Sequence, residues 1–185
     1  MKNSSKYLFK SERLGFRNWN SSDIEKLHEL NSDKEVMEFF PSIPSKSQTS
    51  EFVVRMIKQF EAKGFCYFAV DELVENKFIG FIGLSEQTYE AEFTPCIDIG
   101  WRIKKEFWNK GYATEGAKKC IDYAFNQLKL EKLCSIAPII NQKSIAIMTK
   151  IGMKMQLEFE HPLLKNDSRL KSCVVYSIEN DTLTT

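Results

Sequence analysis

Hydrophobic residues change their spacing several times along the chain, and each change predicts the boundary of a strand or a helix. Alternating apolar residues, the spacing of a half-buried strand, occur at 8–19, 66–72, 77–89, 97–103, 132–136, 155–159 and 172–178. Apolar residues three and four positions apart, the spacing of an amphipathic helix, occur at 24–30, 48–62, 117–128 and 141–151. This order of elements predicts a mixed α/β domain with helices on both faces of one sheet.

Polar residues and glycines mark the ends of these elements. Ser22 to Glu25 and Ser32 to Glu35 both have the pattern of a capping box, and the second precedes an apolar segment that Pro41 ends. Residues 41–50 are rich in Ser and Pro, which predicts a loop over one edge of the sheet. Gly64 and Gly152 follow helical patterns and are expected as caps, Gly64 in the left-handed conformation. The two strands at 66–72 and 77–89 are close enough to form an antiparallel hairpin.

Residues 97–116, IDIGWRIKKEFWNKGYATEG, combine a strand, a glycine-containing turn and the start of a helix. This arrangement directs several backbone N–H groups towards one point, at the positive end of the helix dipole, and favours a phosphate ligand. The charge between Trp101 and Lys119 is +4 in a chain of net charge +1. A turn of this kind can also be an ordinary connection that binds nothing, and Glu115 would repel a phosphate unless its side chain points sideways.

Composition narrows the class of protein. A chain of 185 residues with 43% hydrophobic and 28% charged residues predicts one globular domain over 1–185. The balance of 26 basic and 25 acidic residues argues against a nucleic-acid or membrane partner. The N-terminal residues MKNSSKYLFK lack the apolar run of a signal peptide, which predicts a cytoplasmic protein. His28 and His161 are interpreted as structural, because a metal site or a Cys–His pair would need more such residues together.

The five cysteines are odd in number and widely spaced, with no C-x-x-C pair, and four have apolar neighbours. We expect small buried thiols in a reducing compartment. They are Cys66, Cys96, Cys120, Cys134 and Cys173.

Three segments carry a resemblance to a known family: ERLGFRNWNSSD near the start, IDIGWRI followed by FWNKGYATEG, and Asn141-x-x-Ser144 leading to KIGM. With them the chain resembles the acyl-CoA-dependent N-acetyltransferases of the GNAT superfamily, in the RimJ- and RimL-type branch that acetylates ribosomal-protein N-termini. The resemblance covers about Glu12 to Ile178. It implies a GNAT-like fold with one central, mostly antiparallel sheet, acetyl-CoA as cosubstrate, and no metal.

The resemblance also implies a coenzyme site. The pyrophosphate loop of the family, Arg or Gln-x-x-Gly-x-Gly or Ala, matches residues 108–113, although Trp108 departs from the general pattern and fits the Rim-type branch. Backbone N–H groups would hold the coenzyme phosphates, and the pantetheine arm would bond to the backbone near Trp101 and Ile103, with Asn141 on its other side. The loop residues concerned are Asn109, Lys110, Gly111, Tyr112, Ala113 and Thr114.

Acetyl transfer to an amine needs a base, because α-amino groups titrate near 8 and lysine amines near 10.4. Asp98 is the candidate, in a position where the family typically has Glu, either directly or through a bridging water; the alternative is that it only pairs with Arg102. The family's usual proton donor to the leaving thiolate, a Tyr, is replaced by Met148. Ser144 is the candidate substitute, and the alternative is a helix N-cap or first-turn residue.

The acceptor is left open by the sequence. Ser85 to Asp98 has a charge of −4 directly before the basic segment, which would attract a cationic amine; a solvated hairpin tip is the alternative, particularly for Glu90 and Glu92. The preferred acceptor, by resemblance, is a protein N-terminus, with polyamines, amino acids and aminoglycosides as alternatives. A non-catalytic acyl-CoA-binding module is the second class, suggested by Met148 and the short Asp98. A monomer and a homodimer are equally compatible with the sequence.

Overall fold

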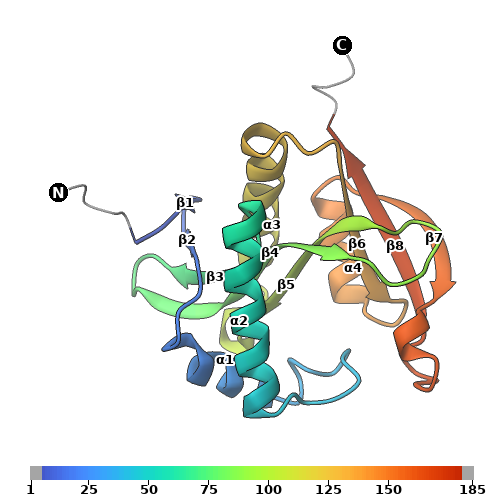
Figure 1. Ribbon diagram of the computed structural model, residues 1–185, viewed down its shortest axis with the longest axis horizontal. Coiled ribbons are helices and arrows are strands. Elements are labelled where there is room, and N and C mark those ends of the chain that lie inside the picture. Colours follow the sequence, from blue (N-terminus) through green and yellow to red (C-terminus); the bar gives the residue numbers. More distant parts are fainter. Residues whose placement is uncertain (1–5, 181–185) are drawn as a thin grey trace.

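The computed structural model describes residues 6–180, so the first and last five residues of the predicted domain lie outside the described part. Eight strands form one sheet in the order β1-β2-β3-β4-β5-β6-β8-β7 (Figure 1). The strands are β1 (Phe9–Lys10), β2 (Leu14–Arg17), β3 (Tyr67–Glu72), β4 (Lys77–Gln87), β5 (Cys96–Ile103), β6 (Lys132–Pro138), β7 (Lys154–Glu160) and β8 (Ser172–Glu179). The helices are α1 (Asp23–Ser32), α2 (Lys46–Lys63), α3 (Tyr112–Asp122) and α4 (Gln142–Lys150).

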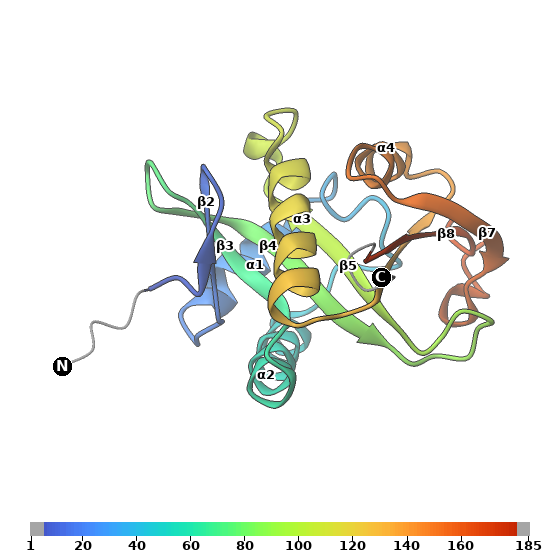
Figure 2. The same cartoon turned by 90° about the horizontal axis from the view of Figure 1, so that it is seen from above.

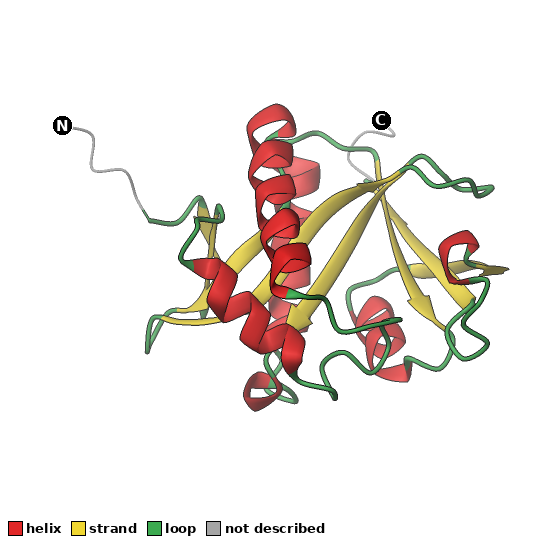
Figure 3. Cartoon of the chain, turned by 60° about the horizontal axis from the view of Figure 1, so that its bottom comes forward, coloured by secondary structure: helices red, strands yellow, loops and turns green. Residues whose placement is uncertain are grey.

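Every neighbouring pair of strands is antiparallel except β5 and β6, which are parallel. Figure 2 shows α3 and α4 on one side of the strands and α2 on the other, and in Figure 3 helices lie both in front of and behind the sheet. Helix α1 packs against α2. The predicted fold, a mostly antiparallel central sheet with helices on both faces, is therefore confirmed.

Most element boundaries agree with the sequence pattern. Strand β4 ends at Gln87, two residues before the predicted end, and α3 continues beyond Asp122 as a π-helical segment, Tyr123–Gln127. The other differences lie in the first 50 residues. The predicted strand at 8–19 is two short antiparallel strands, since the chain turns at Ser11, whose N–H donates to the carbonyl of Leu14 (2.9 Å). Helix α2 begins at Lys46, two residues earlier than predicted, because Ser45 and Gln48 form a capping box there. Gly64 caps its end with φ 75°, in the left-handed conformation, as predicted.

Neither capping box predicted before residue 36 forms. The Ser22 side chain makes no cap bond to α1. Asp23 instead turns its buried carboxylate to Arg17, which lies between Asp23 and Asp71 (2.7 and 2.9 Å). In the second pattern Asp33 accepts from the N–H of Glu35 (2.8 Å), and the residues after it form turns rather than a helix. The predicted cap residues are themselves engaged elsewhere, because the Ser22 hydroxyl donates to the Asn20 side chain (2.5 Å) and the Ser32 hydroxyl to the His28 carbonyl (2.8 Å).

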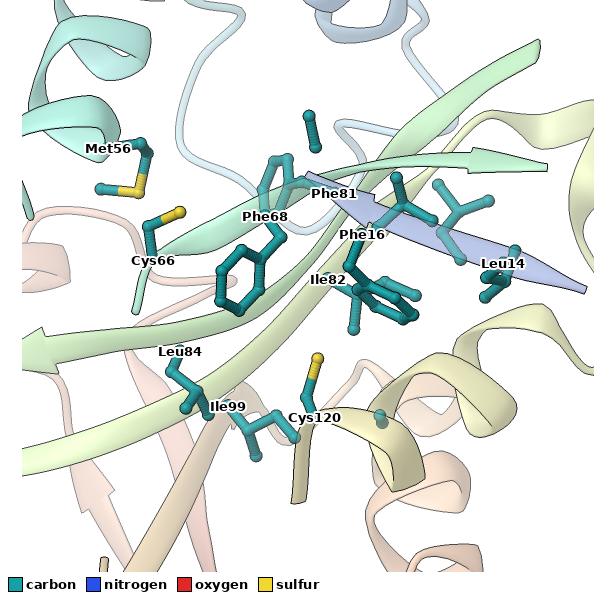
Figure 4. Packing of buried hydrophobic residues seen from close by; sticks show 14 of the residues in the cluster. Leu14, Phe16, Met56, Cys66, Phe68, Phe81, Ile82, Leu84, Ile99 and Cys120 are labelled. Carbon is teal, nitrogen blue, oxygen red and sulfur yellow. The ribbon is translucent and has the colours of Figure 1, made fainter. Parts of the chain in front are cut away.

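The core lies on both faces of β2 to β5 and is lined by the alternating apolar residues that predicted these strands. Figure 4 shows Phe16, Phe68, Ile82 and Ile99 packed together, with Cys120 of α3 beside them. Helix α3 lies close to the sheet at Gly116, where an added Cβ would be 2.2 Å from Cδ1 of Ile82. Among the described residues, no helix is long and apolar enough to cross a membrane.

Two of the five cysteines contradict the expectation of separate thiols. Cys96 and Cys134 form a disulfide, because β5 and β6 lie side by side and Cys134 is paired with Asp98, two residues from Cys96. Their Cα atoms are 6.6 Å apart, within the range that a disulfide spans. Cys66, Cys120 and Cys173 are free and buried, as expected.

Candidate active site

The sheet opens between β5 and β6. The two strands are paired only at Asp98 and Cys134, and the Ser135 hydroxyl then donates to the Ile99 carbonyl (2.9 Å) before the strands separate. The N–H of Lys104 donates to Ile79 on β4, so by the alternation of a strand the N–H groups of Trp101 and Ile103 face the opening. No residue between 6 and 180 accepts a hydrogen bond from either group. The opening thus has an unpaired strand edge along β5.

The turn between β5 and α3 is held at both ends. Trp108, the residue that departs from the general loop pattern, donates its indole N–H to the Ile103 carbonyl (2.8 Å), and Lys143 of α4 lies 4.7 Å from its ring centre. Asn109 and Gly111 both have positive φ (59° and 81°), which folds the turn tightly under the start of α3. Within the described chain, the backbone N–H groups of residues 109–114 have no acceptor. They lie in the loop and first turn of α3, where the helix dipole is positive.

Glu115 does not disturb this positive region, because its carboxylate points sideways to the N-terminal strands. It accepts from the Ser11 hydroxyl (2.7 Å), from the Arg13 backbone N–H (2.8 Å) and from Arg13 Nε (2.7 Å). Partial burial alone would raise the pKa of Glu115, but these hydrogen bonds outweigh it and leave the pKa below its usual value. Arg13 also donates to the Lys110 carbonyl (3.0 Å) and covers the Tyr112 ring. Sequence reasoning assigned no role to Arg13, although it belongs to the ERL segment.

A cavity of about 450 Å³ runs through the opening and brings most of the predicted site together. One side is formed by the β5 edge, the loop and the first turns of α3 and α4, and the other by the segment between α1 and α2 together with Arg102. The predicted residues that line it are Trp101, Ile103, Asn109, Gly111, Tyr112, Ala113, Thr114, Asn141 and Ser144. Lys110 and Asp98 are outside its lining.

Helix α4 presents Asn141 and Ser144 to the cavity. Asn141 caps the helix, accepting from the Ser144 backbone N–H (3.1 Å) through its side-chain oxygen. Ser144 is therefore a first-turn residue and not the cap, and its hydroxyl has no partner among residues 6–180. Met148 follows one turn later and is 1% exposed. The position of the missing Tyr is thus occupied by a core residue, while the free hydroxyl lies one turn earlier in α4 and lines the cavity.

Asp98 lies at the closed end of the opening and is only 7% exposed. Its carboxylate accepts from the Tyr67 hydroxyl (2.5 Å) on β3 and from the backbone N–H of Ile136 on β6. Burial raises the pKa of Asp98 to about 7, although both hydrogen bonds act in the opposite direction. Burial and the Asp98 charge raise the pKa of Tyr67 well above its usual value, so this hydroxyl keeps its proton. Sequence reasoning missed Tyr67, because only the pairing of strands brings it to Asp98.

The alternative role for Asp98, an ion pair with Arg102, is not formed. Arg102 donates to Asn31 of α1 (2.7 Å), and its guanidinium lies 4.0 Å from the Phe40 ring centre. The four acidic residues between Ser85 and Asp98 do not form one acidic cluster. Glu86 pairs with Lys63, and Glu90 and Glu92 are exposed near the hairpin tip. The solvated-tip interpretation therefore fits Glu90 and Glu92, and only Asp98 of the four is buried against the opening.

Comparisons with known proteins show the family and the fold of this chain. Residues 13–154 match the family described as acetyltransferase (GNAT) domain. The chain is 26% identical over 146 residues to the spermidine N(1)-acetyltransferase of Escherichia coli K12, covering 78% of this chain and 74% of that protein.

Two solved structures have the same fold. A GNAT-family acetyltransferase from Bacillus anthracis is 28% identical, with a TM-score of 0.76 over 93% of this chain and 98% of that one. The ribosomal-protein-S5-alanine acetyltransferase from Vibrio fischeri is 18% identical, with a TM-score of 0.75 over 94% and 96% of the two chains.

Proposed function

Since the chain belongs to the GNAT family of N-acetyltransferases, we propose that it moves the acetyl group of acetyl-CoA to a primary amine by direct attack of the amine. One observation carries this proposal: a buried carboxylate with a pKa of about 7, Asp98, lies at the closed end of a strand opening that leads to a cluster of unpaired backbone N–H groups. An anion site and a base beside one cavity are the two parts that this reaction needs.

The cavity suits the coenzyme. The N–H groups of residues 109–114 have no partner in the described chain, and Gly111 and Ala113 allow a diphosphate to approach the backbone closely. The free edge of β5 at Trp101 and Ile103 would bond to the pantetheine arm as an added strand. The Asn141 amide nitrogen would hold the arm from the α4 side. Acetyl-CoA, when bound, supplies an acetyl group activated as a thioester.

Asp98 is placed to remove the proton that keeps an amine from attacking. At pH 7 a carboxyl with a pKa of about 7 is half ionised, and a base matched to the working pH contributes roughly 100- to 10,000-fold to the rate. Since Asp98 is outside the cavity lining, the proton reaches it through a bridging water, as its short side chain suggests. Tyr67 is a positioning residue in this scheme, because its hydroxyl fixes the carboxylate without facing the coenzyme.

Ser144 would return a proton to the leaving thiolate. Its hydroxyl lines the cavity and is free of hydrogen bonds within the described residues, whereas the cap of α4 depends on its backbone N–H and on Asn141. The hydroxyl can therefore act without weakening the helix. Met148 has no proton to give and is buried in the core.

For the acceptor we propose the N-terminal amine of a protein as the first candidate, supported by the Rim-type motifs and by the shared fold with a ribosomal-protein-S5-alanine acetyltransferase. A polyamine is the second candidate, favoured by the sequence similarity to a spermidine acetyltransferase. A module that binds acyl-CoA without catalysis has the same coenzyme site and would show binding without turnover.

The coenzyme part is tested by thermal unfolding with and without acetyl-CoA. At 100 times the dissociation constant, binding stabilises by about 2.7 kcal/mol, a rise of roughly 5–10 °C for a chain of this length. We expect Gly111→Asp to abolish the rise. Gly64→Asp is the matched control, since Gly64 has a similar φ of 75° at the far end of α2 and should keep the rise. No rise in the wild-type protein would refute the proposed function.

A further inference from the structure

Among residues 6–180, Arg17 is buried on the sheet and Arg102 is partly buried there, and of these two arginines only Arg17 has a counter-ion. Arg17 on β2 is 6% exposed and lies between two carboxylates. Its Nε and Nη2 donate to the two oxygens of Asp71 (2.9 and 3.0 Å), and its Nη1 and Nη2 donate to Asp23 (2.7 and 2.9 Å). This is the usual state of a buried guanidinium, whose desolvation is offset by paired, bidentate carboxylates.

Arg102 on β5 has no such partner. Its Nη1 donates to the Asn31 amide oxygen (2.7 Å), and the guanidinium is stacked between the rings of Phe40 and Phe81, 4.0 and 5.2 Å from their centres. Its Nε is buried and has no hydrogen bond. Within residues 6–180, no carboxylate lies within ion-pair distance of it. Burial lowers the pKa of Arg102 to about 10, which still leaves the group charged at neutral pH.

Part of this guanidinium remains for a ligand, and Arg17 shows how the same group holds a carboxylate in this chain. Arg17 holds Asp71 through Nε and Nη2. In Arg102 neither nitrogen has a hydrogen bond within residues 6–180, but Nε is covered by other protein atoms, so Nη2 is the donor left for a ligand. Asn31 occupies Nη1, so the planar group is oriented before any ligand arrives. A charged guanidinium fixed in this way can donate a charge-assisted hydrogen bond from Nη2 to a carboxylate oxygen.

Arg102 also lines the cavity, on the wall away from the phosphate loop. It shares one face of β5 with Asp98, because the two residues are four positions apart on a strand. That face is covered by α1 and α2: Asn31 of α1 holds Arg102, and the Tyr67 ring that reaches Asp98 is stacked on Phe52 of α2. The coenzyme loop and α3 lie on the other face, so the missing anion is on the side where an acceptor would meet Asp98.

The carboxylates of the cavity wall do not fill the gap. Glu35 pairs with Lys105, and Glu38 is exposed with no ion pair among the described residues. Both side chains are exposed, and in the described chain neither forms an ion pair with Arg102. The anion that completes Arg102 must therefore be brought in by a ligand.

We propose that Arg102 binds a carboxylate of the acceptor, so that the amine substrate of this enzyme is one that also carries a carboxylate group. The inference rests on the proposed function and narrows its acceptor. Free amino acids and peptides with an acidic residue beside the N-terminal amine satisfy it. Polyamines do not, because an unpaired guanidinium repels a second cation in the same cavity.

Paired acceptors that differ only in the carboxylate test this proposal with acetyl-CoA as donor. The first set is the twenty amino acids and their α-carboxamides. The second is amidated tetrapeptides with Asp or Glu, or with Asn or Gln, at position two; spermidine is the cationic comparison. In the set that the enzyme acetylates, we expect kcat/KM for the carboxylate form to be about 10-fold or more above that for its amide. Which of the two sets is acetylated shows whether the acceptor is a free amino acid or a peptide.

Arg102→Gln keeps a hydrogen-bond donor and removes the charge. We expect it to lower kcat/KM for the carboxylate acceptor by about 10- to 100-fold, with little change for the amide. Arg55→Gln is the matched control on the exposed face of α2 and should behave as the wild type. The proposal is overturned if the wild type does not favour the carboxylate, if no carboxylate acceptor is acetylated, or if Arg102→Gln slows both forms equally. A tenfold loss of acetyl-CoA affinity in Arg102→Gln would also overturn it, by assigning the anion to the coenzyme.

A second measurement needs no acceptor. If Arg102 serves to bind a ligand and not to stabilise the fold, Arg102→Met should unfold at an equal or higher urea midpoint than the wild type, because the substitution removes an unpaired charge. Arg17→Met should unfold at a much lower midpoint, because it leaves two buried carboxylates unpaired. A loss in Arg102→Met as large as in Arg17→Met would make Arg102 structural and end the proposal. Failure of the proposed function itself is recognised separately, as an absence of acetyl-CoA-dependent stabilisation in the wild type.

Discussion

Tyr67→Phe is the most direct test of how the fold sets the acidity of Asp98. The substitution removes one atom, the hydroxyl oxygen that donates to the Asp98 carboxylate at 2.5 Å. The ring stays in place, since it is stacked between Phe52 and Phe81 (6.4 and 5.3 Å between centres). The Asp98 carboxylate then keeps one hydrogen bond that lowers its pKa, the bond from the backbone N–H of Ile136.

The size of the effect follows from the kind of hydrogen bond lost. A bond to a charged group contributes about 1.5–3 kcal/mol, and 1.36 kcal/mol corresponds to one pH unit, so the pKa of Asp98 should rise by about one to two units from its value of about 7. At pH 7 the ionised fraction then falls from about one half to between roughly one tenth and one hundredth. We expect kcat/KM to fall about 5- to 50-fold at pH 7 and to approach the wild-type value near pH 9.

The assay is the pH profile of kcat/KM between pH 6 and 9.5, followed by release of the coenzyme thiol. The wild-type profile should rise with an apparent pKa near 7, and the Tyr67→Phe profile should rise at higher pH. Tyr123→Phe is the control, because it also removes a part-buried hydroxyl bond, to the Gly64 carbonyl (2.8 Å), and neither residue lines the cavity. A rising limb that moves to lower pH, or that stays in place while the rate falls at every pH, would refute the assignment of Asp98 as the base.

Four further predictions concern stability and the proton donor. Asp71→Asn should lower the free energy of unfolding by about 3–5 kcal/mol in urea titrations, because it leaves the buried Arg17 guanidinium half paired. Gly116→Val should cost about 1–3 kcal/mol by overpacking, and adding Ile82→Val should restore part of it, since the new Cβ would lie 2.2 Å from the Ile82 side chain. The folded-state pKa of Asp98 is raised, so its contribution to stability is fully present below about pH 4 and is lost as the pH rises through 7; Asp98→Asn should flatten this decline of up to about 4 kcal/mol in thermal scans. Ser144→Ala should lower kcat without changing acetyl-CoA affinity or the melting temperature, because the α4 cap uses its backbone N–H; a lower melting temperature would instead assign it a structural role.

The fold was predictable from the sequence because its signals are local. Alternation at 97–103 and helical spacing from Ala117 depend on neighbours within one turn or one strand, and the Asn141 and Ser144 pattern lies at the start of α4 as expected. The prediction of one first strand was wrong in detail, because the three residues 11–13 form a turn between β1 and β2.

The contacts that give the site its chemistry were less accessible, because they join residues far apart in the chain. Tyr67 and Asp98 are 31 residues apart, and Arg17 and Asp71 are 54 apart. The Cys96–Cys134 disulfide spans 38 residues and depends on the parallel pairing of β5 with β6. The missing partner of Arg102 has no sequence signal at all, since it is visible only after every nearby carboxylate has been placed.

The opening between β5 and β6 also has a consequence for solubility. Unpaired strand edges promote association between chains, and proteins usually protect them at the outside of a sheet with charges or short strands. Here an unpaired edge lies inside the sheet, at Trp101 and Ile103, and lines the cavity together with residues of α3 and α4. If α4 loosens on heating, that edge becomes available to another molecule. A ligand hydrogen-bonded along β5 would occupy this edge and block pairing with another chain. Coenzyme should therefore slow aggregation of the warmed protein by more than the rise in the unfolding midpoint alone explains.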